Sequence, residues 1–471
     1  MLSRHANTLG LCAAGLLALA APCPARQGLT LTEAIQYALK QNRDLQMLGL
    51  QLDSRKIAVG LARSQFEFTV RPEGAAQAGS DQSEVRYGAA VARKTEFGTS
   101  VELAGDRTRD RFEDGTEFHR TSLRVRLEQP LLRDAGTTAT REPLTRAEND
   151  IVAMLREIEM RKTDLVVATA ELYEELGQAG REVESLQQTI QRLDGVARLA
   201  RVRERQGRGS RTDTLRSELK LGNAQMRLTA ARERLLTRRA DFADLLGFPC
   251  ETEFDLTTAP ALDIEIPASD AALSTALSNR MDYAQILQDR RDAERGTRIA
   301  RQRLLPDLSL LTGYEARGQG PAAADTARLD DHIWFVGFST AADLPLRGER
   351  LALGRAMNDA RVADLRIETL RAAVARQVQQ ALLAYHRAQA EIPVARQSYQ
   401  LARDRARLSR RLFEMARGDH FSVSEAEDEL QAAEDQWLSA EAAGSVEGYR
   451  LLRVLGTLVD SPAELKPREA R

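Results

Sequence analysis

The two halves of this sequence resemble each other over long stretches. A shift of 238 positions, from 32 to 270, aligns the segment 32–39 with 270–277 and brings Asp44 onto Asp282. A second alignment, from 209 to 418, has an offset of 209 positions and superimposes two Leu-Gly pairs near the ends of the halves. A duplication on this scale predicts two halves of similar architecture, so function is sought in what both halves build together.

The composition favours long solvated helices over several compact cores. Of the 471 residues, 29% are charged and only 5% are aromatic. Abundant Ala, Leu, Arg and Glu with few aromatic residues is typical of long helices. The 67 basic and 69 acidic residues give a net charge of -2, which removes the electrostatic reason to propose a nucleic-acid partner.

The first residues have the layout of a secretory signal. An apolar run over 9–21 follows basic residues and is too short to remain as a membrane helix. We expect a signal peptide over 1–25, cleaved after Ala25, with acylation of Cys23 as the alternative. Cys250 would then be the only thiol, so no intrachain disulfide is expected. Beyond the signal no apolar stretch approaches about 20 residues, so membrane residence would depend on strands.

Each half begins with a helical pattern and continues with strands. Apolar residues recur at helical spacing over 30–65 and again over 269–304. The period then changes to two, and over 123–128 apolar and charged residues alternate, which predicts a strand with one apolar and one polar face. We expect strands over about 68–130 in the first half and about 307–345 in the second.

The first half contains more strand-like sequence than the second. Segments near 84–93 and 99–107, bridged by Glu96, Phe97 and Gly98, predict an additional hairpin, and a polar turn is expected at 109–115. Nothing in the pattern assigns a direction or a role to this hairpin.

The segment after the strands predicts a long helix hairpin. Apolar residues step by four and three over 151–193, a heptad seam that needs a partner helix. A helix over 141–205 would extend on the order of 100 Å. We expect it to turn at Gly207 and Gly209 and to return as a second helix capped by Thr212 or Asp213.

The second half repeats this hairpin over 350–456, around a turn at Gly418, with Pro393 expected to break or kink the longer helix. The predicted organisation is therefore a signal peptide at 1–25, a first repeat at 26–247, a proline-containing linker at 248–268, a second repeat at 269–457 and a tail at 458–471.

Two functional interpretations follow. Long heptad helices alone favour a non-channel periplasmic coiled-coil structural protein. The strands, however, have about the 10 residues that cross a bilayer when tilted in an outer-membrane barrel. One chain has too few strands to close a barrel, and open sheet edges are not tolerated in lipid, so several chains would have to combine their strands.

The order of these features resembles the TolC-like outer-membrane efflux proteins over about 30–460. The resemblance rests on the duplication and on motifs that occur in both halves: Gln129-Pro130-Leu131 and Leu344-Pro345-Leu346, the turn and helix at 207–215 and 422–430, and the closing Leu-Gly pairs. It implies a mainly α chain with membrane β-strands. Its helix hairpins would form a periplasmic α-barrel joined to a trimeric outer-membrane β-barrel, twelve-stranded with four strands from each protomer.

The same resemblance implies the function and the partners. The protein would be a passive trimeric conduit of a tripartite efflux or type I secretion system. Its partners would be two other copies of the chain, a periplasmic adaptor protein, an inner-membrane transporter and outer-membrane lipid. The helix tips, with Gly207, Gly209 and Gly418, would contact the adaptor and open like an iris.

The resemblance also points to residues of a periplasmic aperture. In the family, acids near the start of the returning helices line this opening, which corresponds here to Asp213 in the first half. The equivalent position in the second half is Ser422, and the acid one turn later is Glu425, whose own first-half counterpart is Arg216. A helix cap or a favourable charge at a helix N-terminus is the alternative role for Asp213.

The sequence gives little support for catalysis. Its five His residues show no metal-ligand spacing, and phosphate-binding and nucleophile motifs are missing. We therefore expect no enzyme activity, no cofactor and no metal.

Overall fold

The computed structural model of the protein describes residues 28–80, 82–257, 267–341, 345–415, 417 and 420–467, so the predicted signal peptide and Gly418 lie outside the described residues. The chain divides into two compact units. The first is drawn from Met1–Lys40, Thr169–Ala261 and Tyr399–Ala442, and the second from Gln41–Ala168, Leu262–Ser398 and Ala443–Arg471.

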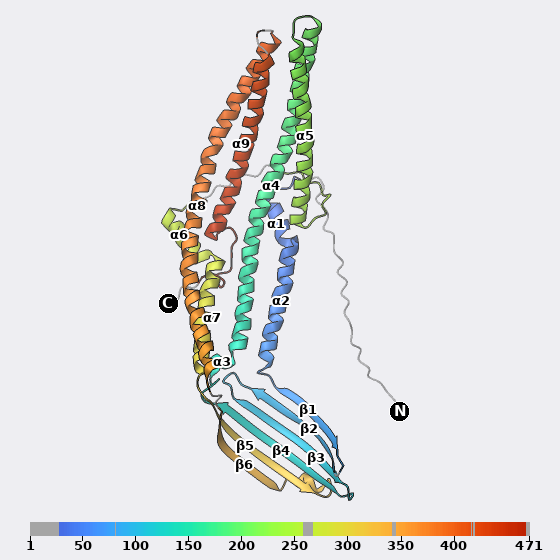
Figure 1. The fold of residues 1–471 in the computed structure, drawn as a ribbon, viewed down its shortest axis with the longest axis vertical. Helices are drawn as coiled ribbons and strands as arrows, with labels where there is room; N and C mark the ends of the chain where they lie inside the picture. Colours follow the sequence, from blue (N-terminus) through green and yellow to red (C-terminus); the bar gives the residue numbers. More distant parts are fainter. Residues whose placement is uncertain are drawn as a thin grey trace, which may run out of the picture. The chain divides into compact units, whose positions relative to one another are not determined.

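Helices of matching length occur in the same order in both halves, with the short helix α3 (Thr137–Thr140) as an addition in the first (Figure 1). The first pair, α1 (Leu31–Gln41) and α6 (Ser269–Asn279), has 11 residues each, and the second, α2 (Arg43–Ser64) and α7 (Met281–Gln302), has 22 each. The long helices α4 (Glu142–Arg205) and α8 (Arg347–Glu414) have 64 and 68 residues, and their returning helices α5 (Arg211–Leu246) and α9 (His420–Leu455) have 36 each.

The single helix expected at the start of each half is wrong, because each half begins with two helices. In the first half the break is at Asn42, whose side-chain oxygen accepts hydrogen bonds from the backbone N–H groups of Asp44 (3.0 Å) and Leu45 (3.3 Å). An Asn that bonds its own backbone in this way starts a new helix rather than continuing one. The break recurs 238 positions later at Arg280, between α6 and α7.

Two further local expectations are corrected. The break expected at Pro393 is wrong, because helix α8 continues through this exposed proline, while the kink expected there stays a prediction. Helix α5 is capped by Ser210, whose hydroxyl accepts from the N–H of Thr212 at 3.2 Å, and not by Thr212 or Asp213.

The strands form one antiparallel sheet in chain order, β1 to β6. Among the described residues the first half contributes four strands and the second two, so the four strands per chain implied by the resemblance are wrong: the sheet has six. The predicted extra hairpin is present as β2 and β3, and the segment 109–112, expected in a turn, still belongs to β3. The strands are β1 (Thr69–Ala78), β2 (Gln82–Lys94), β3 (Ser100–Phe112), β4 (Glu117–Pro130), β5 (Asp307–Gly320) and β6 (Asp331–Ala341).

The register separates an apolar face from a polar face. Val91 pairs with Leu103, Leu103 with Val125, and Val125 with Tyr314, which pairs in turn with Trp334. These residues share one face, because side chains alternate along each strand. Several of its large apolar side chains are exposed: Val70, Tyr87, Leu103, Leu123, Val125, Tyr314, Trp334, Val336 and Phe338.

All connections to helices leave from one end of the sheet (Figure 1). Because consecutive strands are antiparallel, β1 starts and β4 ends at the same end, where α2 and α3 are attached. Strands β5 and β6 join α7 and α8 at this end too. The connections at 113–116 and 321–330, and the β1–β2 connection that begins at Gly79, lie at the opposite end.

Each unit has its own apolar core. In the second unit, buried residues of α6, α8 and α9 pack together, including Ala276, Val378 and Leu451. In the first unit, Phe413 of α8 packs against Val196 of α4 and Val423 of α9. Within the described residues, no helix combines the length and the apolar character that crossing a membrane requires.

Candidate functional site: the polar sheet face and the helix tips

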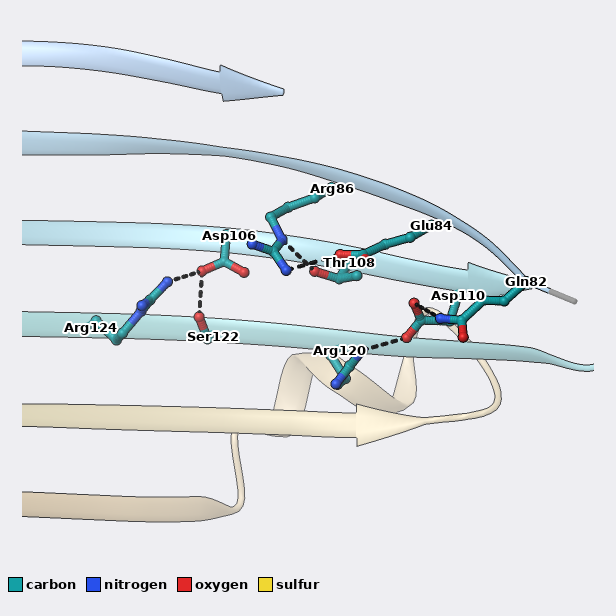
Figure 2. Close-up of polar contacts among 9 residues, drawn as sticks. All are labelled: Gln82, Glu84, Arg86, Asp106, Thr108, Asp110, Arg120, Ser122 and Arg124. Atoms are coloured by element: carbon teal, nitrogen blue, oxygen red, sulfur yellow. Dashed lines mark hydrogen bonds and ion pairs between the residues drawn. The ribbon is translucent and has the colours of Figure 1, made fainter. Parts of the chain in front are cut away.

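Charged and hydroxyl side chains cover the polar face of β2, β3 and β4 (Figure 2). Alternation places them there, because each lies one residue away from a side chain of the apolar face. Asp106 on β3 accepts hydrogen bonds from Ser122 (2.6 Å) and Arg124 (2.7 Å), both on β4. The carboxylate is therefore held by two donors from the neighbouring strand.

A second carboxylate on the same face joins three strands. Asp110 on β3 accepts from Arg120 on β4 at 2.6 Å and from the amide of Gln82 on β2 at 3.1 Å. It is only 2% exposed, so its charge depends on these partners. Arg86 on β2 completes the group, because it donates to Thr108 on β3 (3.3 Å) and to Glu84 (2.9 Å).

Acidic side chains thus line β3 where arginines line β4. The register places Glu102 opposite Arg126, in addition to the pairs that Asp106 and Asp110 form. Next to the arginines, Glu315 on β5 lies opposite Arg124 and also pairs with Arg317 at 2.8 Å. A sheet face that carries many charges of both signs is suited to contact with water and ionic solutes, and its reverse face to contact with an apolar medium.

The connection between β5 and β6 folds back over the far end of the sheet. It contains the short helix η1 (Asp325–Arg328). Thr326, which is 1% exposed, bonds the hydroxyl of Thr121 on β4 at 2.9 Å, and Arg107 on β3 donates to the carbonyl of Ala323 at 2.8 Å. A Cβ at Gly318 would lie 2.2 Å from the Thr326 carbonyl oxygen, so glycine is required for this contact.

In the first unit, the turn between α4 and α5 depends on glycine where α4 ends. Gly207 has φ +70° and donates its N–H to Glu204, while the N–H of Arg208 donates to the carbonyl of Arg203 at 2.9 Å. This is the Schellman pattern, in which glycine satisfies the left-handed position. A Cβ at Gly209 would lie 3.0 Å from that of Arg203, so a second small residue is needed beside the helix end.

The end of α8 shows the same hydrogen-bond span. The N–H of Arg417 donates to the carbonyl of Leu412 at 2.9 Å, as that of Arg208 does to Arg203. The two tips also touch, since the guanidinium of Arg203 lies 4.3 Å from the centre of the Phe413 ring and donates to the Phe413 carbonyl.

The two aperture candidates differ in their surroundings. Asp213 lies half-buried in the first turn of α5, a favourable place for a negative charge. Glu425, with 48% of its side chain exposed, pairs with Arg405 of α8 at 2.8 Å, and Arg405 also binds Glu429. Two carboxylates thus share one guanidinium, which leaves one negative charge and raises the pKa of Arg405, mainly through its hydrogen bond to Glu429.

A buried acidic residue two positions further was not predicted from the sequence. Glu427 of α9 is 3% exposed and accepts from Arg192 of α4 (3.0 Å) and from Arg410 of α8 (2.5 Å). It begins a polar ladder between α4 and α9, in which Thr189 donates to Gln431 (3.1 Å) and Ser185 to Glu434 (2.6 Å). Residues 185, 189 and 192 and residues 427, 431 and 434 are each spaced by four and three. This heptad spacing of polar residues was the available signal.

Burial raises the pKa of Asp435, which accepts from the Gln431 amide at 3.0 Å beside this ladder. Within the described part of the chain, no three His, Cys, Asp or Glu side chains gather in a way that could hold a metal ion.

Comparisons with known proteins identify solved structures with a similar fold. No known family's model matches the sequence, and no curated protein sequence does. Solved structures do: the outer-membrane channel OprN is 18% identical, with a TM-score of 0.71 over 90% of this chain and 89% of that one. The Campylobacter jejuni CmeC outer membrane channel is 13% identical, with a TM-score of 0.70 over 92% and 87%. The open-state Neisseria gonorrhoeae MtrE outer membrane channel is 16% identical, with a TM-score of 0.69 over 91% and 89%.

The resemblance inferred from the sequence is therefore confirmed at the level of the fold. This chain has the fold of the TolC-like outer-membrane efflux channels.

Proposed function

We propose that the protein is the outer-membrane channel of a tripartite efflux or type I secretion system. Three copies would form a passive conduit across the outer membrane and the periplasm. A periplasmic adaptor would couple this conduit to an energised inner-membrane transporter. The chain would act without chemistry of its own, with the polar sheet face lining the conduit and the apolar face in contact with lipid.

The observation that carries this proposal is the two-faced sheet. Its apolar face exposes large side chains such as Trp334 (76% exposed) and Phe338 (71%), which would be unfavourable in water. Its other face holds the paired charges around Asp106 and Asp110, which require water or partners. The likeness of the fold to solved outer-membrane channels supports the same function. A purely structural coiled-coil protein accounts for the helices but not for such a sheet.

Fractionation and oligomer analysis test this proposal. The protein, expressed with its signal, is expected in the outer-membrane fraction, in a detergent-extracted form with the native mass of three copies. Ion conductance in planar bilayers should follow from the same preparation. A monomer recovered from the periplasmic fraction would contradict the proposal and favour the structural alternative.

For the first unit we propose that the tips around Gly207 and Gly209, with Gly418 in the second hairpin, dock the adaptor. Asp213 and Glu425 would set the charge of the aperture. Two features support these roles: the end of α4 needs a glycine, and both acids lie within the first two turns of their helices.

A further inference from the structure

The two halves differ by one pair of strands. The offset between equivalent helices falls from 238, between the starts of α1 and α6, to 209, between the starts of α5 and α9. The first half is therefore 29 residues longer between these points. Strands β2 and β3 have 13 residues each, so a hairpin with its turn accounts for the difference.

This additional hairpin is built into the sheet rather than appended to it. Strand β2 pairs with β1 from Ser83 to Ala92, and β3 pairs with β4 from Ser100 to Arg111. The side-chain contacts of Asp110 with Gln82 and Arg120 join β2 to β4 across β3. The hairpin thus occupies two full positions in the wall of the sheet.

The sheet ends in two open edges that fit each other. Strand β1 has 10 residues and β6 has 11, and they run in opposite directions, because β1 starts and β6 ends at the helix end. Both carry exposed apolar side chains on the same face, Val70 (66% exposed) on β1 and Val336 (62%) on β6. Open edges are not tolerated in lipid.

We propose that β6 of one copy pairs with β1 of the next, and that three copies close an eighteen-stranded barrel instead of a twelve-stranded one. The number of copies rests on the function proposed above. An even number of strands in each copy keeps every neighbouring pair antiparallel when the ring closes.

The consequence is a wider opening at the membrane. With strands about 4.8 Å apart and tilted by about 40°, eighteen strands enclose roughly 36 Å between backbones and twelve roughly 24 Å. The barrel would then rank with the porins of 16 to 18 strands, whose interior remains an aqueous channel.

Disulfide cross-linking tests which strands meet between copies. In a Cys250→Ser background, Ala75→Cys on the polar face of β1 is combined in turn with a cysteine at Ile333, Phe335 or Gly337 on the polar face of β6. Cross-linked dimers and trimers are expected for at least one pair. Ala75→Cys with Val336→Cys, on the opposite face of β6, is the matched control and should give none.

In a competing set of variants, Ala75 is left unchanged and the first cysteine is introduced at Thr108 on β3, which also lies on the polar face. Cross-links from Thr108→Cys to β6, without any from Ala75→Cys, would mean that β1 and β2 lie outside the wall and would overturn the proposal. Cross-links from neither position would overturn it too. The native mass of the same samples reports separately whether the trimer, and with it the proposed function, survives.

A deletion provides the second test. Removing residues 79–111 joins Ala78 to Phe112, so that Ala78 takes the place of Arg111 opposite Glu117, and β1 then pairs with β4. Averaged end-on electron-microscopy views should show the barrel diameter reduced to about two-thirds of the wild-type value. An unchanged diameter would contradict the inference. If the shortened chain does not assemble, counting strands in the wild-type barrel decides directly: twelve would refute the proposal.

Discussion

At the scale of single residues, a few side chains fix the backbone where helices end or segments meet. Tyr173 of α4, which is 3% exposed, donates its hydroxyl to the carbonyl of Leu29 at 2.7 Å and also contacts that of Thr257. Leu29 is itself hydrogen-bonded to Asp255 and Thr257. The hydroxyl of Tyr173 thus connects α4 to the segment before α1, at Leu29, and to the segment after α5, at Thr257.

We expect Tyr173→Phe to destabilise this junction by about 1–3 kcal/mol, because the carbonyl of Leu29 loses a donor. Burial raises the pKa of Tyr173 from 10.0 to about 12. The protonated phenol is therefore favoured by folding, and its contribution is complete below pH 10 and lost as the pH rises through 12. A phenolate absorbance titration should show a late-ionising tyrosine in the wild type that is missing from the variant; ionisation near pH 10 would contradict this.

Gly207 provides the second prediction at this scale. Gly207→Ala forces an L side chain into the left-handed region at φ +70°, at a cost of about 1 kcal/mol. Trypsin should then cleave faster at the neighbouring Arg205 and Arg208, and export should fall while trimer assembly is retained. Gly222→Ala, within α5, is the matched control: its Cβ meets no atom within 4 Å, so it should leave cleavage unchanged or slow it. Equal loss of export and assembly would assign the turn to folding instead of docking.

At the scale of elements, what the sequence predicted depended on how regular the pattern was. Helix α4 was predicted closely because the seam over 151–193 keeps its period for many turns. Strand β1 had no such signal, since its sequence Thr-Val-Arg-Pro-Glu-Gly-Ala-Ala-Gln-Ala contains Pro and Gly and few apolar side chains. The break at Asn42 was hidden, because the apolar spacing continues across it and only the side-chain cap interrupts the helix.

The candidate site was also predictable only where the sequence pattern is regular. Alternation over 123–128 indicated a polar face, but the pairing of Asp106 with Arg124 depends on the register between strands, which no local pattern specifies. The turn glycines followed from their position between two helices. The buried Glu427 was overlooked because an acid among many acids on a helix is usually solvated.

The polar ladder between α4 and α9 gives a prediction at the element scale. Glu427→Gln leaves Arg192 and Arg410 without their shared carboxylate, which we expect to cost roughly 2–4 kcal/mol, since both cations retain some exposure. Glu425→Gln, two positions away, breaks the exposed pair with Arg405 and should cost only about 0–1 kcal/mol. Thermal melting of the helices followed by circular dichroism should show the larger drop for Glu427→Gln. Equal shifts would indicate that burial does not strengthen the Glu427 pair.

At the scale of the whole molecule, each acidic residue near the axis contributes three negative charges if three copies surround that axis. The double variant Asp213→Asn with Glu425→Gln keeps side-chain volume and removes six carboxylates from the proposed trimer. We expect a weaker preference for cations in planar bilayers and less block by multivalent cations from the periplasmic side. Both effects should be larger at low salt, where screening is weak.

The outcome also distinguishes the alternative role of Asp213. A favourable charge at the start of α5 would appear as a lower melting temperature with conductance unchanged. Unchanged selectivity in a stably assembled double variant would remove both residues from the aperture.

Because α2, α3, α7 and α8 all join the sheet at the same end, the number of strands in the sheet can change only in steps of two. A single added strand would leave the chain at the far end, away from the start of α3, whereas a hairpin returns it to where it began. Duplication followed by such an insertion leaves α1, α2 and α5 at the lengths of α6, α7 and α9. Adding or removing a hairpin could therefore change the diameter of the proposed barrel without changing the lengths of these helices.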